Sequence, residues 1–307
     1  MKILNFGSLN IDNVYRVANI VRPGETISSI SMEIHCGGKG LNQSLALAKA
    51  GMEVFHAGMV GREDGSLLLN ALSRGGVRTE LIGTCEGKSG HCVIQVDDRG
   101  QNSIVLCGGA NHAITKAYVQ EVMDHMEPGG LLLLQNEINH MELILKEAKK
   151  RGLFVILNPS PMDETLINMD LSGVGMFLLN EVEGADIAGV SETEEIIEAI
   201  QRKYPGVELV LTLGSQGSVY AGKYGVIRQA ACRVNAVDTT AAGDTFTGYF
   251  ISEYFAHGDV KKALELASRA SAIAVTRPGA AESIPVRSEV EAYKKQKIEK
   301  FEKNRKN

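Results

Sequence analysis

Hydrophobic positions along the chain fall into short continuous runs that alternate with amphipathic segments. Residues 131–134 (LLLL) and 209–211 (LVL) are apolar at every position, which is typical of strands buried on both faces of a parallel sheet. Between such runs, apolar residues recur at helical spacing, as in residues 65–74. This alternation of strand and helix predicts an α/β fold with a doubly wound, mostly parallel sheet.

The same pattern predicts the boundaries of the elements. Strands are expected at 2–7, 54–60, 131–135, 153–157, 174–179 and 208–213, followed by an antiparallel patch at 218–234. Helices are expected from the glycines at 37–40 to about residue 50, and at 65–74, 115–126, 140–150, 192–203, 243–256, 260–276 and 288–303. No internal repeat or interdomain linker interrupts the series, so we expect a single domain over residues 1–307.

Two parts of the chain do not fit this alternation. Residues 11–35 have apolar positions at strand spacing beyond a Pro23-Gly24 turn. Residues 91–96 and 103–107 are typical of two strands joined by a hairpin at residues 97–100 (DDRG). Because no helix separates these strands, we expect them to form a small accessory sheet outside the main one.

Composition excludes several classes of function. Hydrophobic residues make up 44% of the 307 residues and charged residues 22%, and the net charge of −5 provides no attraction to nucleic acid or anionic membranes. No apolar run approaches the roughly 20 residues of a membrane span, and the N-terminus does not resemble a signal peptide. The five cysteines are scattered without a CxxC pair. We therefore expect a cytoplasmic protein with reduced thiols and neither a nucleic-acid nor a membrane partner.

The stretch from Asn235 to Gly248 carries the strongest chemical signal. Residues 241–243 (AAG) have almost no side chain and lead into an apolar helical pattern. Backbone N–H groups at such a helix start are unpaired and partly positive, which favours a phosphate group. Asp244 places a carboxylate beside this site, where it can accept a proton from a hydroxyl group. The alternative is that Asp244 is an ordinary first-turn acid and that the small residues serve close packing.

The glycine run at residues 37–40 is a second candidate for ligand binding. It is not a Walker A loop, because Gly40 rather than Ser or Thr follows Lys39. It is not a dinucleotide loop either, because Gln43 stands where the third glycine is required. The run still offers backbone donors, a lysine and, one turn later, Asn42, which suit a polyhydroxyl or anionic ligand. A plain tight turn before a helix is the alternative.

Polar residues follow several predicted strands, at the edge where open α/β sheets bind ligands. Asn10 and Asp12 follow the first strand and Glu137 follows the strand at 131–135, and such amides and carboxylates suit sugar hydroxyls. Residues 212–217 (TLGSQG) are rich in small polar groups. Residues 180–183 (NEVE) could hold Mg²⁺ through water, or could simply be a helix start with acids in its first turn.

Together these features resemble the ribokinase-like (PfkB) family of sugar kinases, over nearly the whole chain from Gly7 to about Val286. Residues 37–42 (GGKGLN) are similar to the family's N-terminal glycine signature. Residues 238–246 (DTTAAGDTF) are similar to its C-terminal DTxGAGD signature, with Ala241 at the first glycine. Other departures are Leu41 for the commoner Ala, Asn136 where Leu is usual, and Ser160 for Ala in the turn after Asn158-Pro159. None of them removes a sugar-contacting group.

The resemblance implies roles for particular residues in phosphorylating a sugar with ATP, most closely D-ribose at its 5-hydroxyl. Asp244 would be the general base, with an anion hole of backbone amides at 242–244 next to Ala241. The residues implied to contact the sugar are Asn10, Asp12, Gly38, Lys39, Asn42, Glu137 and Asp244. The residues implied on the nucleotide side are Asn180, Thr212, Gly214, Ser215, Gly217 and Gly243.

The resemblance also implies metals, a mobile sheet and a partner. Mg²⁺ would accompany ATP, with Glu183 acting through water, and K⁺ would bind near Asp238, Thr240, Gly279 and Ser283. A Rossmann-like core would carry a β-sheet lid formed by residues 11–35 and 84–107, and the lids of two subunits would interlock in a homodimer.

Three other functions stay open on the sequence. A related kinase of another sugar or of a nucleoside is the nearest, although a nucleoside needs apolar room for its base. A non-catalytic sugar-binding regulator is disfavoured by the intact Asp244. A nicotinamide oxidoreductase is disfavoured by the missing GxGxxG motif.

Overall fold

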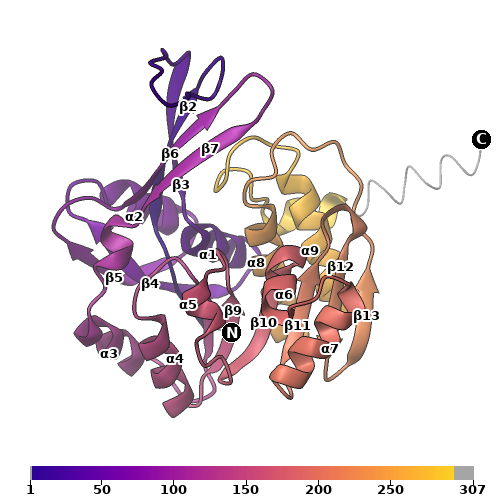
Figure 1. The fold of residues 1–307 in the computed structure, drawn as a ribbon. Helices are drawn as coiled ribbons and strands as arrows, with labels where there is room; N and C mark the ends of the chain where they lie inside the picture. The colour runs from indigo at the N-terminus through magenta and orange to yellow at the C-terminus, as the bar shows by residue number, and fades with distance from the viewer. Residues whose placement is uncertain (1, 294–307) are drawn as a thin grey trace, which may run out of the picture.

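The computed structural model describes residues 2–293, and in them the chain forms two sheets of very different size (Figure 1). The larger sheet has the strand order β13-β12-β11-β10-β9-β8-β1-β4-β5. Its strands are β1 (Lys2–Phe6), β4 (Glu53–Gly61), β5 (Arg78–Cys85), β8 (Leu131–Gln135), β9 (Phe154–Asn158), β10 (Val174–Asn180), β11 (Glu208–Thr212), β12 (Ser218–Gly222) and β13 (Gly225–Gln229). Pairing is parallel from β5 to β11 and antiparallel for the last two strands, β12 and β13.

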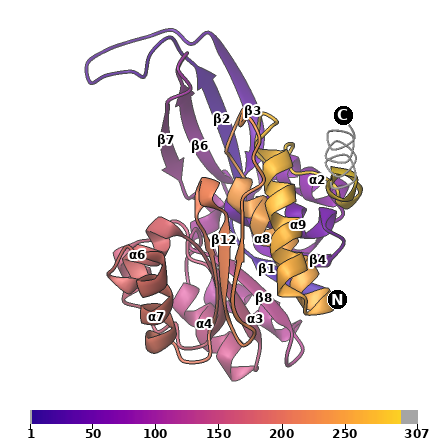
Figure 2. The ribbon, with the colours of Figure 1, turned by 90° about the vertical axis from the view of Figure 1, so that its right-hand side faces the viewer.

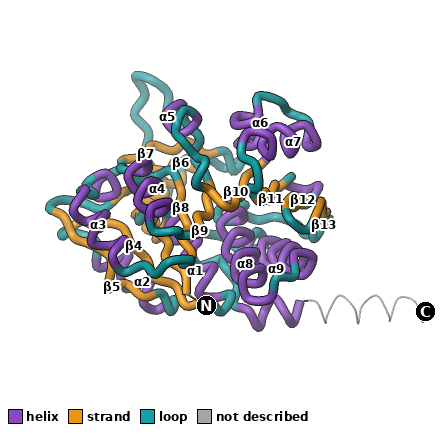
Figure 3. Tube along the Cα trace, turned by 90° about the horizontal axis from the view of Figure 1, so that it is seen from below, coloured by secondary structure: helices purple, strands orange, loops and turns teal. Residues whose placement is uncertain are grey.

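Helices cover both faces of this sheet (Figures 2 and 3). One face carries α1 (Lys39–Lys49), α2 (Ser66–Arg74), α8 (Ala242–His257) and α9 (Val260–Ala274). The other carries α3 (Lys116–Asp124), α4 (Met141–Lys150), α5 (Glu164–Ile167), α6 (Glu181–Ala188) and α7 (Thr193–Lys203). Along the described residues, no helix has both the length and the apolar character that crossing a bilayer requires.

The continuously apolar strands explain why both faces are covered. In β8, Leu131 and Leu133 belong to the hydrophobic cluster under α1 and α8, while Leu132 and Leu134 belong to the cluster under α3 and α4. Successive side chains of a strand point to opposite faces, so a run of leucines needs an apolar layer on each side. The predicted doubly wound α/β fold is therefore confirmed.

The smaller sheet projects from one end of the main domain (Figure 1). Its order is β3-β2-β6-β7, formed by β2 (Asn10–Arg16), β3 (Ser31–Gly37), β6 (Gly90–Val96) and β7 (Asn102–Cys107). The expected hairpin joins β6 to β7, and the Asp97 carboxylate accepts the N–H groups of Arg99 and Gln101, both at 2.9 Å. Residues set apart by their sequence pattern thus do form an accessory sheet.

Several predicted boundaries need correction. The lid range 84–107 begins inside β5, where Thr84 and Cys85 pair with β4 in the main sheet, so the small sheet starts only at Gly90. β5 was not predicted because it is a half-exposed edge strand without a continuous apolar run. Residues 17–30 of the expected strand region contain no strand, and the short helix α5 was missed. The helix start considered at residues 180–183 is observed as the start of α6. Of the expected helix at 288–303, residues 287–293 are helical and the rest lies outside the described residues.

Helices α1 and α8 approach each other unusually closely at Gly248. A Cβ atom on Gly248 would lie 2.4 Å from the Cβ of Ala46 and 2.7 Å from the backbone nitrogen of Leu47, so only glycine fits there. One turn further along, the Ser252 hydroxyl donates to the carbonyl of Ala50 at 3.3 Å. This contact places the start of α1 directly beside the start of α8.

Candidate active site

The glycine run forms a tight junction between β1 and α1. Gly40 lies so close to the end of β1 that a Cβ atom on it would be 2.4 Å from the backbone nitrogen of Ser8. Gly38 precedes the helix with a positive φ of 92°. Glu137 closes the junction, because its Oε2 accepts the N–H of Lys39 at 3.0 Å and the hydroxyl of Ser8. The predicted residues Gly38, Lys39 and Glu137 are therefore brought together.

The two polar residues after the first strand lie at the base of the small sheet. Asn10 is buried, and its Oδ1 accepts the side-chain N–H of Asn111 at 2.7 Å. Asn111 in turn accepts the backbone N–H of Leu9 at 2.9 Å. Asn111 was missed in the sequence because it sits in a short 3₁₀ turn, Gly109–His112, that has no apolar pattern.

Burial raises the pKa of both carboxyl groups that were predicted to bind the sugar, Asp12 and Glu137. It raises the pKa of Asp12 to about 6, and the neighbouring charge of Glu137 adds to this effect while a hydrogen bond from the Cys92 thiol opposes it. Burial also raises the pKa of Glu137, partly offset by the hydrogen bond from Ser8 and by Lys39. Asp12 and Glu137 are near enough for their charges to interact, and each carboxyl group can accept hydrogen bonds from hydroxyl groups when it is ionised.

Asp244 lies in the first turn of α8 and is 8% exposed. Its Oδ2 accepts the side-chain N–H of Asn42 at 3.1 Å, and its Oδ1 accepts that of Gln43 at 2.9 Å. The side-chain oxygen Oδ1 of Asn42 is buried and has no hydrogen-bond partner in the described residues. The two sequence signatures, 202 residues apart at this contact, thus meet in space.

The turn before Asp244 presents free backbone donors. Ala241 has the left-handed conformation (φ 57°, ψ 10°), which costs an alanine about 1–2 kcal/mol and explains why glycine is found there in the family's signature. Of the three amides expected in the anion hole, that of Ala242 already donates to the Thr239 carbonyl at 3.2 Å. In the described part of the chain the amides of Gly243 and Asp244 have no acceptor. The hole therefore has two free donors rather than three.

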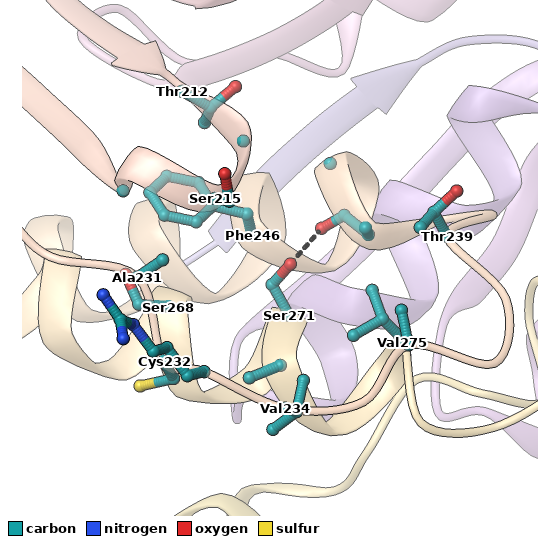
Figure 4. Close-up of a pocket in the computed structure, with 17 residues that line it drawn as sticks. Thr212, Ser215, Ala231, Cys232, Val234, Thr239, Phe246, Ser268, Ser271 and Val275 are labelled. Carbon is teal, nitrogen blue, oxygen red and sulfur yellow. Dashed lines mark hydrogen bonds between the residues drawn. The ribbon is translucent and has the colours of Figure 1, made fainter.

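A large cavity of about 740 Å³ opens beside this turn (Figure 4). Four predicted nucleotide residues after β11 line it, together with one from the α8 turn: Thr212, Gly214, Ser215, Gly217 and Gly243. A second cavity of about 210 Å³ is lined by Lys39, Asn180, Glu183, Gly243 and Asp244. The two cavities adjoin, because Thr212, Thr239, Ala242, Gly243 and Phe246 line both. Asp244 lines the smaller cavity and therefore lies next to the large one.

Part of the large cavity wall was missed in the sequence. It comes from residues 231–234 and from α9, which contributes Ser268, Ser271 and Ala272 (Figure 4). The Ser271 hydroxyl donates to the carbonyl of Ala242 at 3.0 Å and so ties α9 to the turn. Small residues on an amphipathic helix carry no signal of ligand binding, so only the tertiary structure could reveal them.

Asn180 and Glu183 form a capping box at the start of α6. The backbone N–H of Glu183 donates to Asn180 Oδ1 at 2.8 Å, and that of Asn180 donates to Glu183 Oε2 at 3.0 Å. Within residues 2–293, no cluster of three or more His, Cys, Asp or Glu side chains could hold a metal ion. A magnesium ion here would therefore depend on phosphate and water oxygens besides one carboxylate.

Three of the four predicted potassium residues are joined by hydrogen bonds. Asp238 Oδ1 accepts the backbone N–H and the hydroxyl of Thr240 at 2.9 and 2.6 Å, and Oδ2 accepts the N–H of Gly279 at 3.0 Å. These bonds outweigh burial and hold the pKa of Asp238 below its usual value. Ser283 lies on the same loop as Gly279, fully buried, and donates to the Ala280 carbonyl at 2.8 Å. The loop-bracing role of Asp238 is therefore observed.

Comparison with known proteins agrees with this geometry. Residues 1–287 match the pfkB family of carbohydrate kinases. The chain is 36% identical to a ribokinase of Haemophilus influenzae, covering 92% of this chain and 95% of that protein. It is 37% identical to a ribokinase of Schizosaccharomyces pombe, covering 95% and 97%. The structure of Arabidopsis thaliana ribokinase complexed with ribose and ATP superimposes with a TM-score of 0.82 at 30% identity, covering 94% and 96%. The chain therefore belongs to the pfkB family of carbohydrate kinases.

Proposed function

We propose that this carbohydrate kinase transfers the γ-phosphoryl group of ATP to the 5-hydroxyl of D-ribose. One observation carries the proposal: Asp244 lines the cavity that adjoins the large cavity and also contacts Asn42, which follows the glycine run. A sugar held by the small-sheet side and a nucleotide held in the large cavity would meet at this carboxylate. The similarity to proteins named ribokinase supports ribose as the acceptor.

In this mechanism the oxygen of the sugar hydroxyl attacks the γ-phosphorus while Asp244 accepts the proton of that hydroxyl. The bond from that phosphorus to the β-phosphate oxygen breaks, and ADP leaves. The free amides of Gly243 and Asp244 donate to the charge that grows on the transferring group, helped by their position at the start of α8. Positioning and electrostatics therefore account for the chemistry.

The polar character of the sugar side favours a small polyol over a nucleoside. Asp12, Glu137 and the unpaired side-chain oxygen of Asn42 are all acceptors that hydroxyl groups would satisfy. An assay that couples ADP release to a visible signal, run over a panel of sugars and nucleosides, tests the substrate. Turnover with ribose is the expected result, and turnover with another acceptor but none with ribose would overturn the assignment.

Magnesium fits the oxygen groups beside the smaller cavity. Glu183 Oε2 is used in the capping box, so its Oε1 would hold the ion through water. When bound, magnesium would neutralise part of the charge on the phosphates of ATP. Asn180, which lines the same cavity, holds the helix start in place for this role.

A potassium ion fits the loop that Asp238 braces. The carboxylate is ionised at neutral pH, and no ion pair joins it to a cationic side chain in residues 2–293. The carbonyls of Thr240 and Gly279 and the hydroxyl of Ser283 would complete a set of oxygen ligands, which suits a hard cation. Such an ion would not touch the substrate but would fix the turn that carries the anion-hole amides.

The small sheet fits a role as a lid and as a dimer contact. Pairing across the sheet places Ile34, Asn13, Val93 and Val105 in one row, and its three apolar members, Ile34, Val93 and Val105, are 55%, 40% and 66% exposed. An exposed row that is mostly apolar favours a protein contact. The occupant would be the same sheet of a second copy, giving a homodimer in which each lid closes over a sugar.

Asp244→Asn keeps the shape of the side chain and removes its ability to accept a proton. We expect kcat to fall on the order of 10²- to 10⁴-fold, with a much smaller change in the KM for ribose. Asp259→Asn is a matched control, because Asp259 is a helix-start carboxylate that caps α9 away from the cavities. A near-normal kcat for Asp244→Asn would show that Asp244 is an ordinary first-turn acid and not the general base.

The raised pKa of Asp12 predicts how ribose binding depends on pH. The carboxyl is mostly ionised at pH 7 and protonated at pH 5, and sugar hydroxyls donate to the ionised form. The KM for ribose should therefore rise about tenfold as the pH falls from 7 to 5, while the KM for ATP changes little. Asp12→Asn should show a higher KM for ribose without this pH dependence. A flat profile in the unmodified protein would contradict the assignment.

Potassium should activate turnover through kcat. The assay is run at constant ionic strength with potassium exchanged for a bulky organic cation, and we expect kcat to drop because the anion-hole turn loses its support. In Asp238→Ala the activation by potassium should disappear. If kcat in the organic-cation buffer equals that in potassium, the carboxylate only braces the loop.

The dimer is tested by placing a charge in the apolar row of the lid. In size-exclusion chromatography with light scattering, the unmodified protein should have twice the mass of one chain. Val105→Glu should have the mass of one chain, because a charge buried in the dimer contact without a partner is costly. Val226→Glu, on the edge strand β13 and 60% exposed, is the control and should leave the mass unchanged. A monomeric unmodified protein would rule out the dimer.

A further inference from the structure

A chain of buried side-chain hydrogen bonds begins at Asp244 and runs through Gln43. An ionised carboxylate can only accept, so the Gln43 amide must turn its nitrogen toward Asp244. This nitrogen donates to Asp244 Oδ1 at 2.9 Å and to Asn158 Oδ1 at 2.8 Å, which uses both of its hydrogens. The side chain of Gln43 is fully buried.

The orientation of Gln43 is fixed again from its other side. Its Oε1 accepts from the nitrogen of Gln135 at 2.7 Å, and that nitrogen also donates to Asn5 Oδ1 at 2.9 Å. The nitrogen of Asn5 donates to the Ser44 hydroxyl and to the Gly40 carbonyl, both at 2.8 Å. All three of these side-chain amides are fully buried, so no water can replace a broken bond.

The chain ends at a neutral histidine. The Ser44 oxygen lies 2.8 Å from Nδ1 of His56, and burial lowers the pKa of His56 to about 4. Ser44 accepts from Asn5 and shares one hydrogen bond with Nδ1 of His56, whose direction depends on the histidine tautomer. The amide donors point outward from Gln135, toward Asp244 on one side and toward Ser44 on the other. Turning any one amide over would set two like atoms against each other.

We infer that Gln43 is a positioning residue that holds the carboxylate of Asp244 in the direction required to accept the proton of the sugar hydroxyl. Asn42 holds one oxygen and Gln43 the other, which fixes the plane of the carboxylate. The four remaining members of the chain keep Gln43 from rotating. This inference rests on the proposed role of Asp244 as the general base.

Two substitutions of Gln43 separate positioning from packing. Gln43→Met removes both amide N–H donors and keeps a side chain of similar length. Gln43→Glu keeps an oxygen to accept from Gln135 but cannot donate to Asp244 when ionised. Ser252→Ala is the matched control, because it also removes a buried hydrogen bond between α1 and α8, two turns from Asp244. Thermal unfolding of each variant establishes that the compared proteins are folded.

Both Gln43 variants should lose about 10- to 100-fold in kcat, with KM values for ribose and ATP changed little. The acid limb of the kcat profile should move to higher pH, because the lost donors stabilise the ionised carboxylate more than the protonated one. This shift is assigned from Gln43→Met, because Gln43→Glu adds a second carboxyl beside Asp244. The other titratable groups around Asp244 are Lys39 and Glu183, which line the same cavity, and Glu137, and Gln43→Met alters none of them. Ser252→Ala should keep the kcat and the pH profile of the unmodified protein.

The decisive comparison places each Gln43 variant in the Asp244→Asn background. If Gln43 acts through Asp244, the second substitution should cause no further loss of kcat. Additive losses there, or an unchanged kcat and pH profile in the folded single variants, would overturn the inference. Asp244→Asn alone tests the general base separately, so a failure of that assignment is distinguishable from a failure of Gln43 positioning.

Discussion

The site depends on how closely two helices approach each other. Gly248 lets α8 lie against α1 at a distance that no larger residue allows, because any Cβ there would overlap Ala46 and Leu47. One turn back on each helix, this contact brings Asp244 within hydrogen-bond distance of Asn42 and Gln43. The signatures at residues 37–42 and 238–246 lie far apart in the sequence, so their meeting point is a property of helix packing.

Much of the site follows from sequence because its groups depend on local backbone. The glycine run and the turn at 241–244 were both predicted as helix starts, and the structure places them at the starts of α1 and α8. The continuous apolar strands also identified the doubly wound core. Each of these features has a local cause, either a special backbone conformation or burial on both faces. A local cause determines the residue types of a short stretch, so it can be recognised in the sequence.

What the sequence did not reveal is tertiary in origin. Gln43 was considered only as a missing glycine, yet it contacts Asp244, Asn158 and Gln135 from three other elements. The wall of the large cavity formed by α9 uses serine and alanine, which are common on any helix. The edge strand β5 has too mixed a pattern to stand out. In each case the role comes from a neighbour distant in sequence.

The left-handed backbone of Ala241 limits what evolution can place at this position. Ala241 lines the smaller cavity and is 9% exposed, so a replacement meets both a backbone and a chemical restriction. Branched side chains are excluded because their Cβ substituents clash in this conformation. Asparagine and aspartate tolerate it, but they would add a polar group to the wall of a cavity beside Asp244. Position 241 can therefore accept alanine or glycine. Almost any other residue would change the polarity of the cavity wall or strain the backbone.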